Sequence, residues 1–248
     1  MNGRAEVQMV FQRYEIKYLL TGKQREKIMA AMKPYMALDA YGHSTIRNIY
    51  YDTDTYRLIR TSLEKPVYKE KLRVRSYRLA GPEDEVFVEM KKKYDSVVYK
   101  RRIGISQRCA AEYLAGRAQP PIENQITDEI AYFLQFYKTL KPKVFLSYER
   151  EAYFTIEPSE FRVTFDENIL WRETDLSLRK GIYGEAILEP GQVLMEIKTA
   201  GNLPFWMVRV LSEEKIRKTS FSKYGSAYEM IMAGEYGSRA AGMRAALG

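Results

Sequence analysis

Cations on alternate residues are the feature of this sequence with the clearest chemical capacity. In the segment KEKLRVR, Lys69, Lys71, Arg73 and Arg75 stand two residues apart. A β-strand sends successive side chains to opposite faces, so these four cations would share one face of a strand. Like charges held side by side repel one another unless an anion lies among them. The spacing therefore predicts a site for a highly charged anion, and phosphate chains are the first candidates.

The same alternation of charge recurs in three other segments, which are 15–17 (EIK), 89–93 (EMKKK) and 196–198 (EIK). Arginine suits phosphate because its planar guanidinium donates two hydrogen bonds to one phosphate and keeps its charge. Lysine supplies a mobile point charge. The alternative is cross-strand pairing of Glu and Lys on a solvated sheet, with no ligand.

The elements that would position these residues form an antiparallel sheet with helices. Strands are predicted at 10–20, 44–51, 67–79, 85–93, 97–105, 143–153, 162–166 and 193–199. Helices are predicted at 23–32, 107–115, 124–137, 204–216 and 222–233, with a short helix ending at residue 62. Because no Pro- or Ser-rich linker interrupts this series, we expect one domain over 1–233 and a mobile tail over 234–248.

The sequence pattern does not decide whether the sheet stays open or closes into a barrel. Val74, Val88 and Met90 define an apolar face that helices would cover, and the opposite face is charged. An open sheet would leave the charged face in water. A closed barrel would make it a lumen, which must then hold water, carboxylates and an anionic ligand.

The composition narrows the partners and the compartment. The chain has 248 residues, a net charge of +8 and 46% hydrophobic residues, so it can bury a core and favours anionic partners. Its single cysteine, Cys109, excludes an intramolecular disulfide framework. No apolar run is long enough to span a bilayer, and no leader peptide is evident, so we expect a cytoplasmic protein. Nucleic acid is not an expected partner, since no binding motif for it accompanies the charge.

Nine short motifs occur in order from residue 13 to residue 224: RYEIKY (13–18), IYYDT (49–53), KLRVR (71–75), VFVEMK (86–91), VYKRR (98–102), SYER (147–150), RVTFD (162–166), LMEIK (194–198) and FSKY (221–224). Each motif alone is common, but the ordered series resembles the VTC domain. That domain is the polyphosphate polymerase domain of the triphosphate tunnel metalloenzyme superfamily.

The resemblance implies an α+β fold, in which an antiparallel eight-stranded β-barrel forms a tunnel with a charged lumen and helices packed outside. It implies a metal-dependent polyphosphate polymerase, which transfers the γ-phosphate of ATP to a growing polyphosphate chain. A triphosphate hydrolase on the same tunnel and a non-catalytic polyphosphate-binding module are the alternatives. ATP and inorganic polyphosphate are the implied ligands, and a separate membrane protein is a possible partner.

The resemblance also implies the site residues. The catalytic cations would be Lys17, Arg73, Arg75, Lys91, Lys100, Arg150, Arg162 and Lys223. Glu196 matches the carboxylate that holds Mn²⁺ or Mg²⁺. Further substrate-binding candidates are Ser222, Lys93, Glu89 and Glu15, although the two glutamates are also expected to form structural salt bridges; Asp166 is a possible helper. A register slip in the run Lys100, Arg101, Arg102 would turn a different cation inward, and the sequence leaves that register open.

Overall fold

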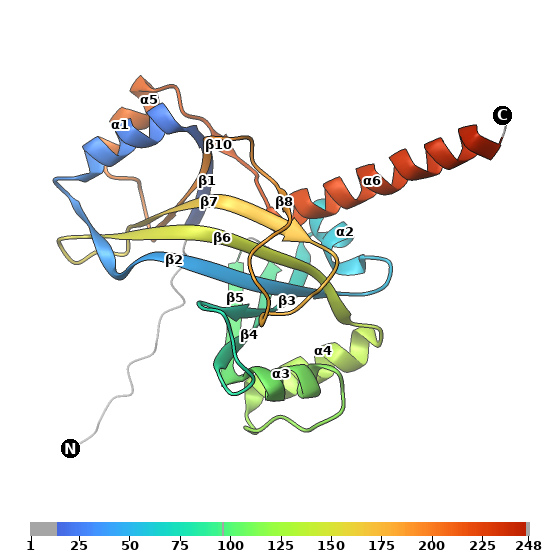
Figure 1. The fold of residues 1–248 in the computed structure, drawn as a ribbon. Coiled ribbons are helices and arrows are strands. Elements are labelled where there is room, and N and C mark those ends of the chain that lie inside the picture. Colours follow the sequence, from blue (N-terminus) through green and yellow to red (C-terminus); the bar gives the residue numbers. More distant parts are fainter. Residues whose placement is uncertain (1–13, 96, 247–248) are drawn as a thin grey trace, which may run out of the picture.

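A computed structural model describes residues 14–95 and 97–246, and side chains as far as Gly234. The described chain contains ten strands and six helices (Figure 1). The strands are β1 (Tyr14–Thr21), β2 (Met36–Asp52), β3 (Tyr68–Ser76), β4 (Glu85–Tyr94), β5 (Val97–Ser106), β6 (Lys141–Thr155), β7 (Arg162–Arg172), β8 (Glu185–Ala186), β9 (Gln192–Thr199) and β10 (Lys218–Thr219). The helices are α1 (Gly22–Met32), α2 (Arg57–Leu63), α3 (Gln107–Leu114), α4 (Gln125–Tyr137), α5 (Phe205–Glu213) and α6 (Lys223–Ala246).

All eight predicted strands are present, and the start of the first one, 10–13, lies outside the described residues. Strands β8 and β10 were not predicted, because two residues carry no periodicity. The predicted end of the last helix, Ala233, is too early, since the backbone of α6 is helical to Ala246 and projects from the body of the protein (Figure 1). The mobility expected for residues 234–248 stays a prediction.

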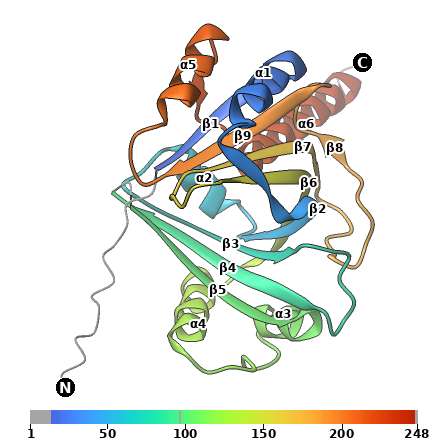
Figure 2. The same ribbon diagram turned by 90° about the vertical axis from the view of Figure 1, so that its left-hand side faces the viewer.

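The strands form one antiparallel sheet in the order β10-β1-β9-β7-β6-β2-β3-β4-β5, with β8 beside β7. Among the described residues, no strand pairing joins β5 to β1 or β10, so the predicted closed eight-stranded barrel is not confirmed. The sheet curls instead, and β3, β4 and β5 lie across from β1 and β9 (Figure 2). A contact of 3.7 Å between Lys91 Nζ on β4 and Glu15 Oε2 on β1 spans the open side. We call the concave side of this curled sheet the inner face.

Two hydrophobic cores cover the outer face, as the apolar strand positions predicted. One core packs α3 and α4 against β3, β4 and β5, and Leu72, Met90 and Ile130 are among its buried residues. The other packs α1 and α5 against β1, β7 and β9, and Ile197 and Met207 are among its buried residues. Since these helices use the apolar faces of the strands, the charged faces are left to point inward.

A third core occupies part of the inner face, beneath α2 and the first turns of α6. It includes Tyr50, Leu146 and Tyr224. The Tyr224 hydroxyl donates to Asp52 Oδ2 at 3.0 Å, and the same buried carboxylate accepts from the backbone N–H of Ile59 at 3.0 Å. This core therefore fixes the start of α6 inside the curl, next to the charged strands. Within the described residues, no helix combines the length and apolar character that crossing a bilayer requires.

Candidate anion-binding site

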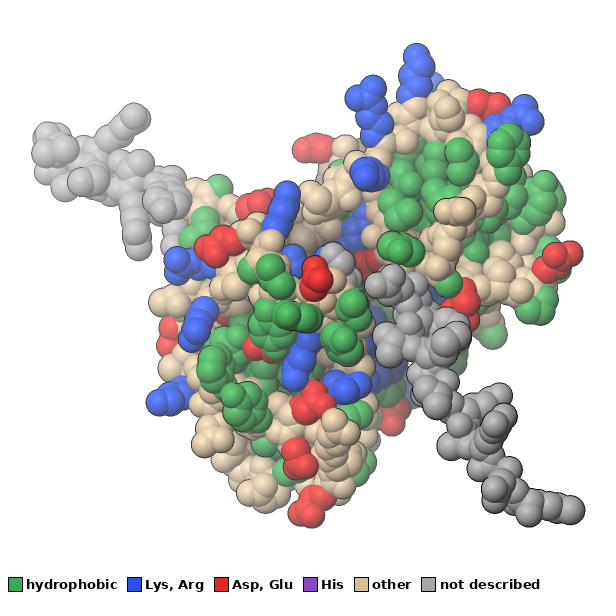
Figure 3. Space-filling model, turned by 180° about the vertical axis from the view of Figure 1, so that it is seen from behind, with side chains coloured by type: hydrophobic (Ala, Val, Ile, Leu, Met, Phe, Trp, Pro, Cys, Tyr) green, Lys and Arg blue, Asp and Glu red, His purple; other side chains and the backbone are tan. Residues whose placement is uncertain are grey.

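Strand β3 presents its cations to the inner face, as the alternation predicted. Leu72 and Val74 are buried in the outer core, so Lys71, Arg73 and Arg75 point the other way. Seen from behind, Lys and Arg side chains are visible between the part with α3 and α4 and the part with α1 and α5 (Figure 3). The strand geometry therefore gathers cations between the two halves of the curl.

Glu89 on β4 is the centre of a first charge cluster. Its carboxylate is 2.7 Å from Arg73 Nε, 2.6 Å from Lys100 Nζ and 3.7 Å from Arg75 Nε, and its side chain is 2% exposed. Burial alone would raise the pKa of Glu89, but these cations lower the pKa to about 2. Glu89 therefore stays ionised and neutralises only part of the positive charge around it. Its predicted structural salt bridge is present.

Hydrogen bonds orient the two arginines of β3. Arg75 donates to Asn48 Oδ1 at 2.9 Å and to Tyr148 Oη at 3.0 Å. Arg73 donates to Tyr50 Oη at 3.0 Å. Burial would raise the pKa of Tyr50, but Arg73 and its cationic neighbours lower it to about 8. The sequence prediction did not include these partners, because Tyr50 and Tyr148 lie 23 and 73 residues along the chain from the arginines that they contact.

Glu196 on β9 and Asp166 on β7 form a second cluster. Lys223 Nζ lies 2.5 Å from Asp166 and 3.1 Å from Glu196. Arg150 also joins the two carboxylates, at 2.5 Å from Asp166 and 3.2 Å from Glu196, and Lys17 Nζ is 3.6 Å from Glu196. Burial would raise the pKa of Glu196, but Lys223, Arg150 and Lys17 hold it well below its usual range. Asp166 therefore contributes to the cluster directly.

The segment before α6 connects the two sides of the open curl. Lys17 Nζ on β1 donates to the Phe221 carbonyl at 3.0 Å. Lys71 Nζ on β3 donates to Ser222 Oγ at 3.3 Å. This segment therefore places Ser222 and Lys223 among cations from both sides, where the sequence prediction expected them.

The register of β5 is settled by its neighbours. Lys100 and Arg102 both approach Glu89, at 2.6 and 3.9 Å. Arg101 turns to the outer face, where its Nε lies 3.2 Å from Glu129 on α4. Lys100 and Arg102 therefore point inward, in the register that the sequence left open, and Arg102 is an additional inner cation.

The remaining predicted residues lie toward the rim of the inner face. Glu15 is 3.4 Å from Lys17 and 3.7 Å from Lys91, and its side chain is 31% exposed. Lys93 lies beside Lys69 in the β3–β4 register, on the same face as Lys91. Exposed Arg162 lies beside Lys198 in the β7–β9 register, with its guanidinium 4.0 Å from the Phe154 ring centroid.

Lys198 is a further inner cation that the site prediction did not include. Burial lowers its pKa, while Glu15 and Glu196 act in the opposite direction. Its position two residues after Glu196 in EIK is the sequence signal that could have found it.

The carboxylates fit a divalent metal only if phosphate shares it. Among the described residues there is no group of three or more His, Cys, Asp or Glu side chains suited to a metal. Glu196 and Glu15 flank the same Lys17 ammonium, at 3.6 and 3.4 Å. Mg²⁺ commonly uses one or two carboxylates together with substrate phosphates, and this donor set matches that pattern. The residues therefore fit a metal bound together with a phosphate substrate.

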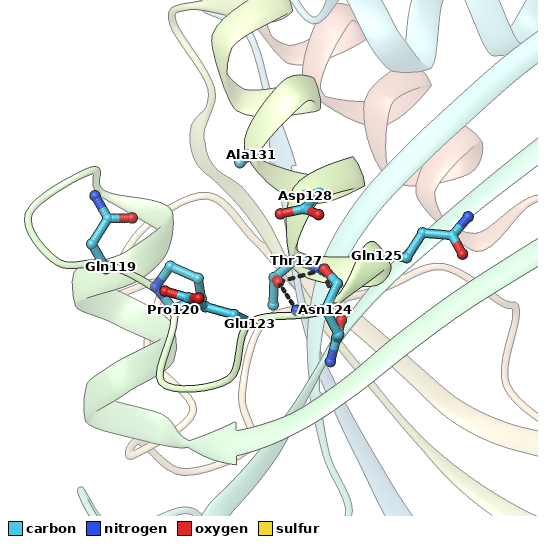
Figure 4. A pocket seen from close by; sticks show the side chains of 8 residues that line it. All are labelled: Gln119, Pro120, Glu123, Asn124, Gln125, Thr127, Asp128 and Ala131. Atoms are coloured by element: carbon cyan, nitrogen blue, oxygen red, sulfur yellow. Dashed lines mark hydrogen bonds between the residues drawn. The ribbon is translucent and has the colours of Figure 1, made fainter.

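A hollow of about 360 Å³ at the start of α4 is separate from this site (Figure 4). There the backbone N–H of Asn124 donates to Thr127 Oγ1 at 2.9 Å, and the backbone N–H of Thr127 donates to Asn124 Oδ1 at 3.1 Å. The residues around this hollow form the N-terminal cap of α4. Because α4 packs on the outer core, the hollow lies on the opposite side of the sheet from Glu89.

The VTC domain family matches residues 12–232. The chain belongs to the VTC domain family. The predicted resemblance is confirmed, and no curated protein matches the chain.

Solved structures with a similar fold include a candidate adenylate cyclase from Bacillus halodurans, at 14% identity and a TM-score of 0.50, covering 85% of this chain and 95% of that one. A candidate adenylyl cyclase from Hippeastrum, described as having a dominant triphosphatase activity, is 13% identical with a TM-score of 0.48, over 85% and 93% of the two chains. At such identities the likeness concerns the fold alone.

Proposed function

We propose that this VTC domain is a metal-dependent polyphosphate polymerase that transfers the γ-phosphate of ATP to a growing polyphosphate chain. The observation that carries the proposal is the excess of cations over carboxylates on the inner face. The inner cations are Lys17, Lys71, Arg73, Arg75, Lys91, Lys100, Arg102, Arg150, Lys198 and Lys223, and the carboxylates are Glu15, Glu89, Asp166 and Glu196.

Phosphoryl transfer depends mainly on positioning and on neutralising negative charge. Arg73 and Arg75, held by Tyr50 and Tyr148, present oriented guanidinium groups to a phosphate chain. Lys223 bonds to carboxylates in the structure and would turn toward phosphate oxygens when the substrate binds.

Glu196, with Glu15 beside it, would then hold Mn²⁺ or Mg²⁺ together with the substrate. The bound metal would supply charge neutralisation at the transferring phosphate. Lys17, which contacts both carboxylates, would move to the phosphate oxygens as the metal binds.

A triphosphate hydrolase is the second candidate, and the third hydrophobic core favours it. Tyr50, Leu146 and Tyr224 fill the inner face beneath α2 and α6. A long chain would therefore have to leave along the open side of the curl, whereas a short triphosphate needs no such exit. A binding module without turnover would use the same cations.

The test is to incubate the purified protein with ATP and Mn²⁺ or Mg²⁺, and to measure polyphosphate on a stained gel together with ADP and free phosphate. Long chains with ADP support the polymerase, and free phosphate without chains supports the hydrolase instead. Glu196→Gln should abolish turnover, and Glu129→Gln on the outer face is the matched control. Tight polyphosphate binding without turnover would contradict both enzymes.

A further inference from the structure

Lys71 and Ser222 form a lysine–serine pair that phosphate binding alone does not require. Lys71 Nζ donates to Ser222 Oγ at 3.3 Å, from β3 to the residue preceding α6. The same Oγ accepts from the backbone N–H of Gly225 at 3.2 Å. The hydroxyl hydrogen of Ser222 is not used in either bond, so it remains available for transfer.

The position of Ser222 is fixed by its surroundings. The next-but-one residue, Tyr224, stacks on Tyr50 with ring centroids 4.5 Å apart and donates to buried Asp52. Gly225 allows the close approach, because a Cβ there would lie 3.0 Å from Leu63 Cδ2 and 3.1 Å from Ser222 Cβ. Ser222 is therefore presented to the inner face by a rigid helix start.

The charge environment of Lys71 suits a general base. None of the described carboxylates forms a salt bridge with Lys71, and Lys91 lies directly opposite it in the β3–β4 register. Burial lowers the pKa of Lys71 to about 8; Tyr50 opposes this effect, whereas Lys17, Lys91 and Lys69 add to it. A fraction of the amine is thus neutral near physiological pH, and a neutral amine beside a hydroxyl can accept its proton.

A phosphate on Ser222 would be stabilised where it formed. It would lie at the N-terminus of α6, with Lys71 at hydrogen-bonding distance from the serine oxygen. Lys17, bonded to the neighbouring Phe221 carbonyl at 3.0 Å, adds a second ammonium group.

We propose that Ser222 is a phosphoryl acceptor, which takes the first γ-phosphate when no polyphosphate is present. Ser222 Oγ forms a bond to the γ-phosphorus, the bond between that phosphorus and the β–γ bridging oxygen breaks, and ADP leaves. The hydroxyl proton passes to the neutral Lys71 amine. This inference rests on the proposed binding of ATP at the inner face.

The test is to incubate the protein with γ-³²P-labelled ATP and Mn²⁺, without polyphosphate, and to locate the label by peptide mass spectrometry. Acid-stable label on Ser222 is expected, with Ser226→Ala, one turn further along α6, labelled as wild type. Ser222→Asn keeps an oxygen for the helix cap but lacks a hydroxyl, and should lose the label while remaining folded. Lys71→Met should slow labelling at least ~10-fold and remove its rise with pH through about 8.

Label on another residue, or full labelling of Ser222→Asn, would overturn the assignment. Absence of label from protein that still extends added polyphosphate would overturn this inference and leave the proposed function intact. Absence of both label and any ATP turnover would overturn the proposed function as well.

Discussion

Replacing Glu89 with Gln removes the one carboxylate, among the residues that the structure describes, that forms salt bridges with Arg73, Arg75, Lys100 and Arg102. The pKa of Glu89 is lowered from 4.5 to about 2 by these cations, against the effect of burial. At about 1.4 kcal/mol per pKa unit, the folded state gains roughly 3 kcal/mol from keeping this carboxylate ionised. For a chain of this size, losing it should lower the melting temperature by roughly 6–12 °C.

The assay is thermal unfolding with and without tripolyphosphate, an anion that would replace the missing charge. Glu89→Gln should be less stable than wild type, and tripolyphosphate should raise its melting temperature more than that of wild type, because the ligand binds the folded state. Glu129→Gln is the matched control, since Glu129 pairs with Lys92 and Arg101 on the outer face of the same strands. Equal responses of the two variants to tripolyphosphate would refute the reasoning.

The sign of the pH effect follows from the lowered pKa. A carboxylate whose pKa is lower in the folded state contributes its full stability above the unfolded value of 4.5. That contribution is lost as the pH falls from 4.5 toward 2. The wild-type protein should therefore lose stability more steeply than Glu89→Gln across this range. Parallel curves would show that the Glu89 cluster does not form.

Two further changes test other parts of the site. Glu196→Gln removes the carboxylate that Lys223 and Arg150 share. Metal-dependent turnover should be lost, while calorimetry should still detect tripolyphosphate binding. Normal turnover of this variant would show that Glu196 does not hold the metal. Tyr224→Phe deprives buried Asp52 of one hydrogen-bond donor and should cost about 1–2 kcal/mol in urea unfolding. An unchanged urea midpoint would show that this bond does not hold α6 in place.

Strand periodicity was sufficient to predict that Lys71, Arg73 and Arg75 share one face of β3. Arg73 and Arg75 point inward because Leu72 and Val74 are buried on the other side, and a period of two leaves no alternative. The run Lys100, Arg101, Arg102 could not be assigned in this way, because consecutive cations satisfy either register. Its register depends on Glu89 and Glu129, which are distant in sequence.

Closure of the sheet and the length of the last helix were beyond the sequence pattern. The sheet would close only if its edge strands paired with each other. The edge of β1 that faces away from β9 pairs instead with β10, a strand of two residues that no periodicity could predict. The residues after Gly234 are small and show no clear apolar periodicity, which favoured a tail, although their alanines and arginines are good helix formers and the backbone is helical. The hydrogen bonds of Tyr50 and Tyr148 to the arginines also depend on tertiary contact.

The binding of tripolyphosphate to the inner face is tested most directly by isothermal titration calorimetry. Tripolyphosphate is titrated into wild type, Arg73→Ala and Arg101→Ala, each at low and at high salt. Arg73 on β3 and Arg101 on β5 lie on opposite faces of the sheet, on the two strands that flank β4. Each forms a salt bridge with a glutamate, so the two substitutions are comparable. Arg73→Ala should weaken binding by roughly 10- to 100-fold and reduce its dependence on salt, because charge-assisted hydrogen bonds contribute about 1.5–3 kcal/mol. Arg101→Ala should bind as wild type does. Equal affinities for the two variants would show that the inner cations are a solvated surface without a polyphosphate site.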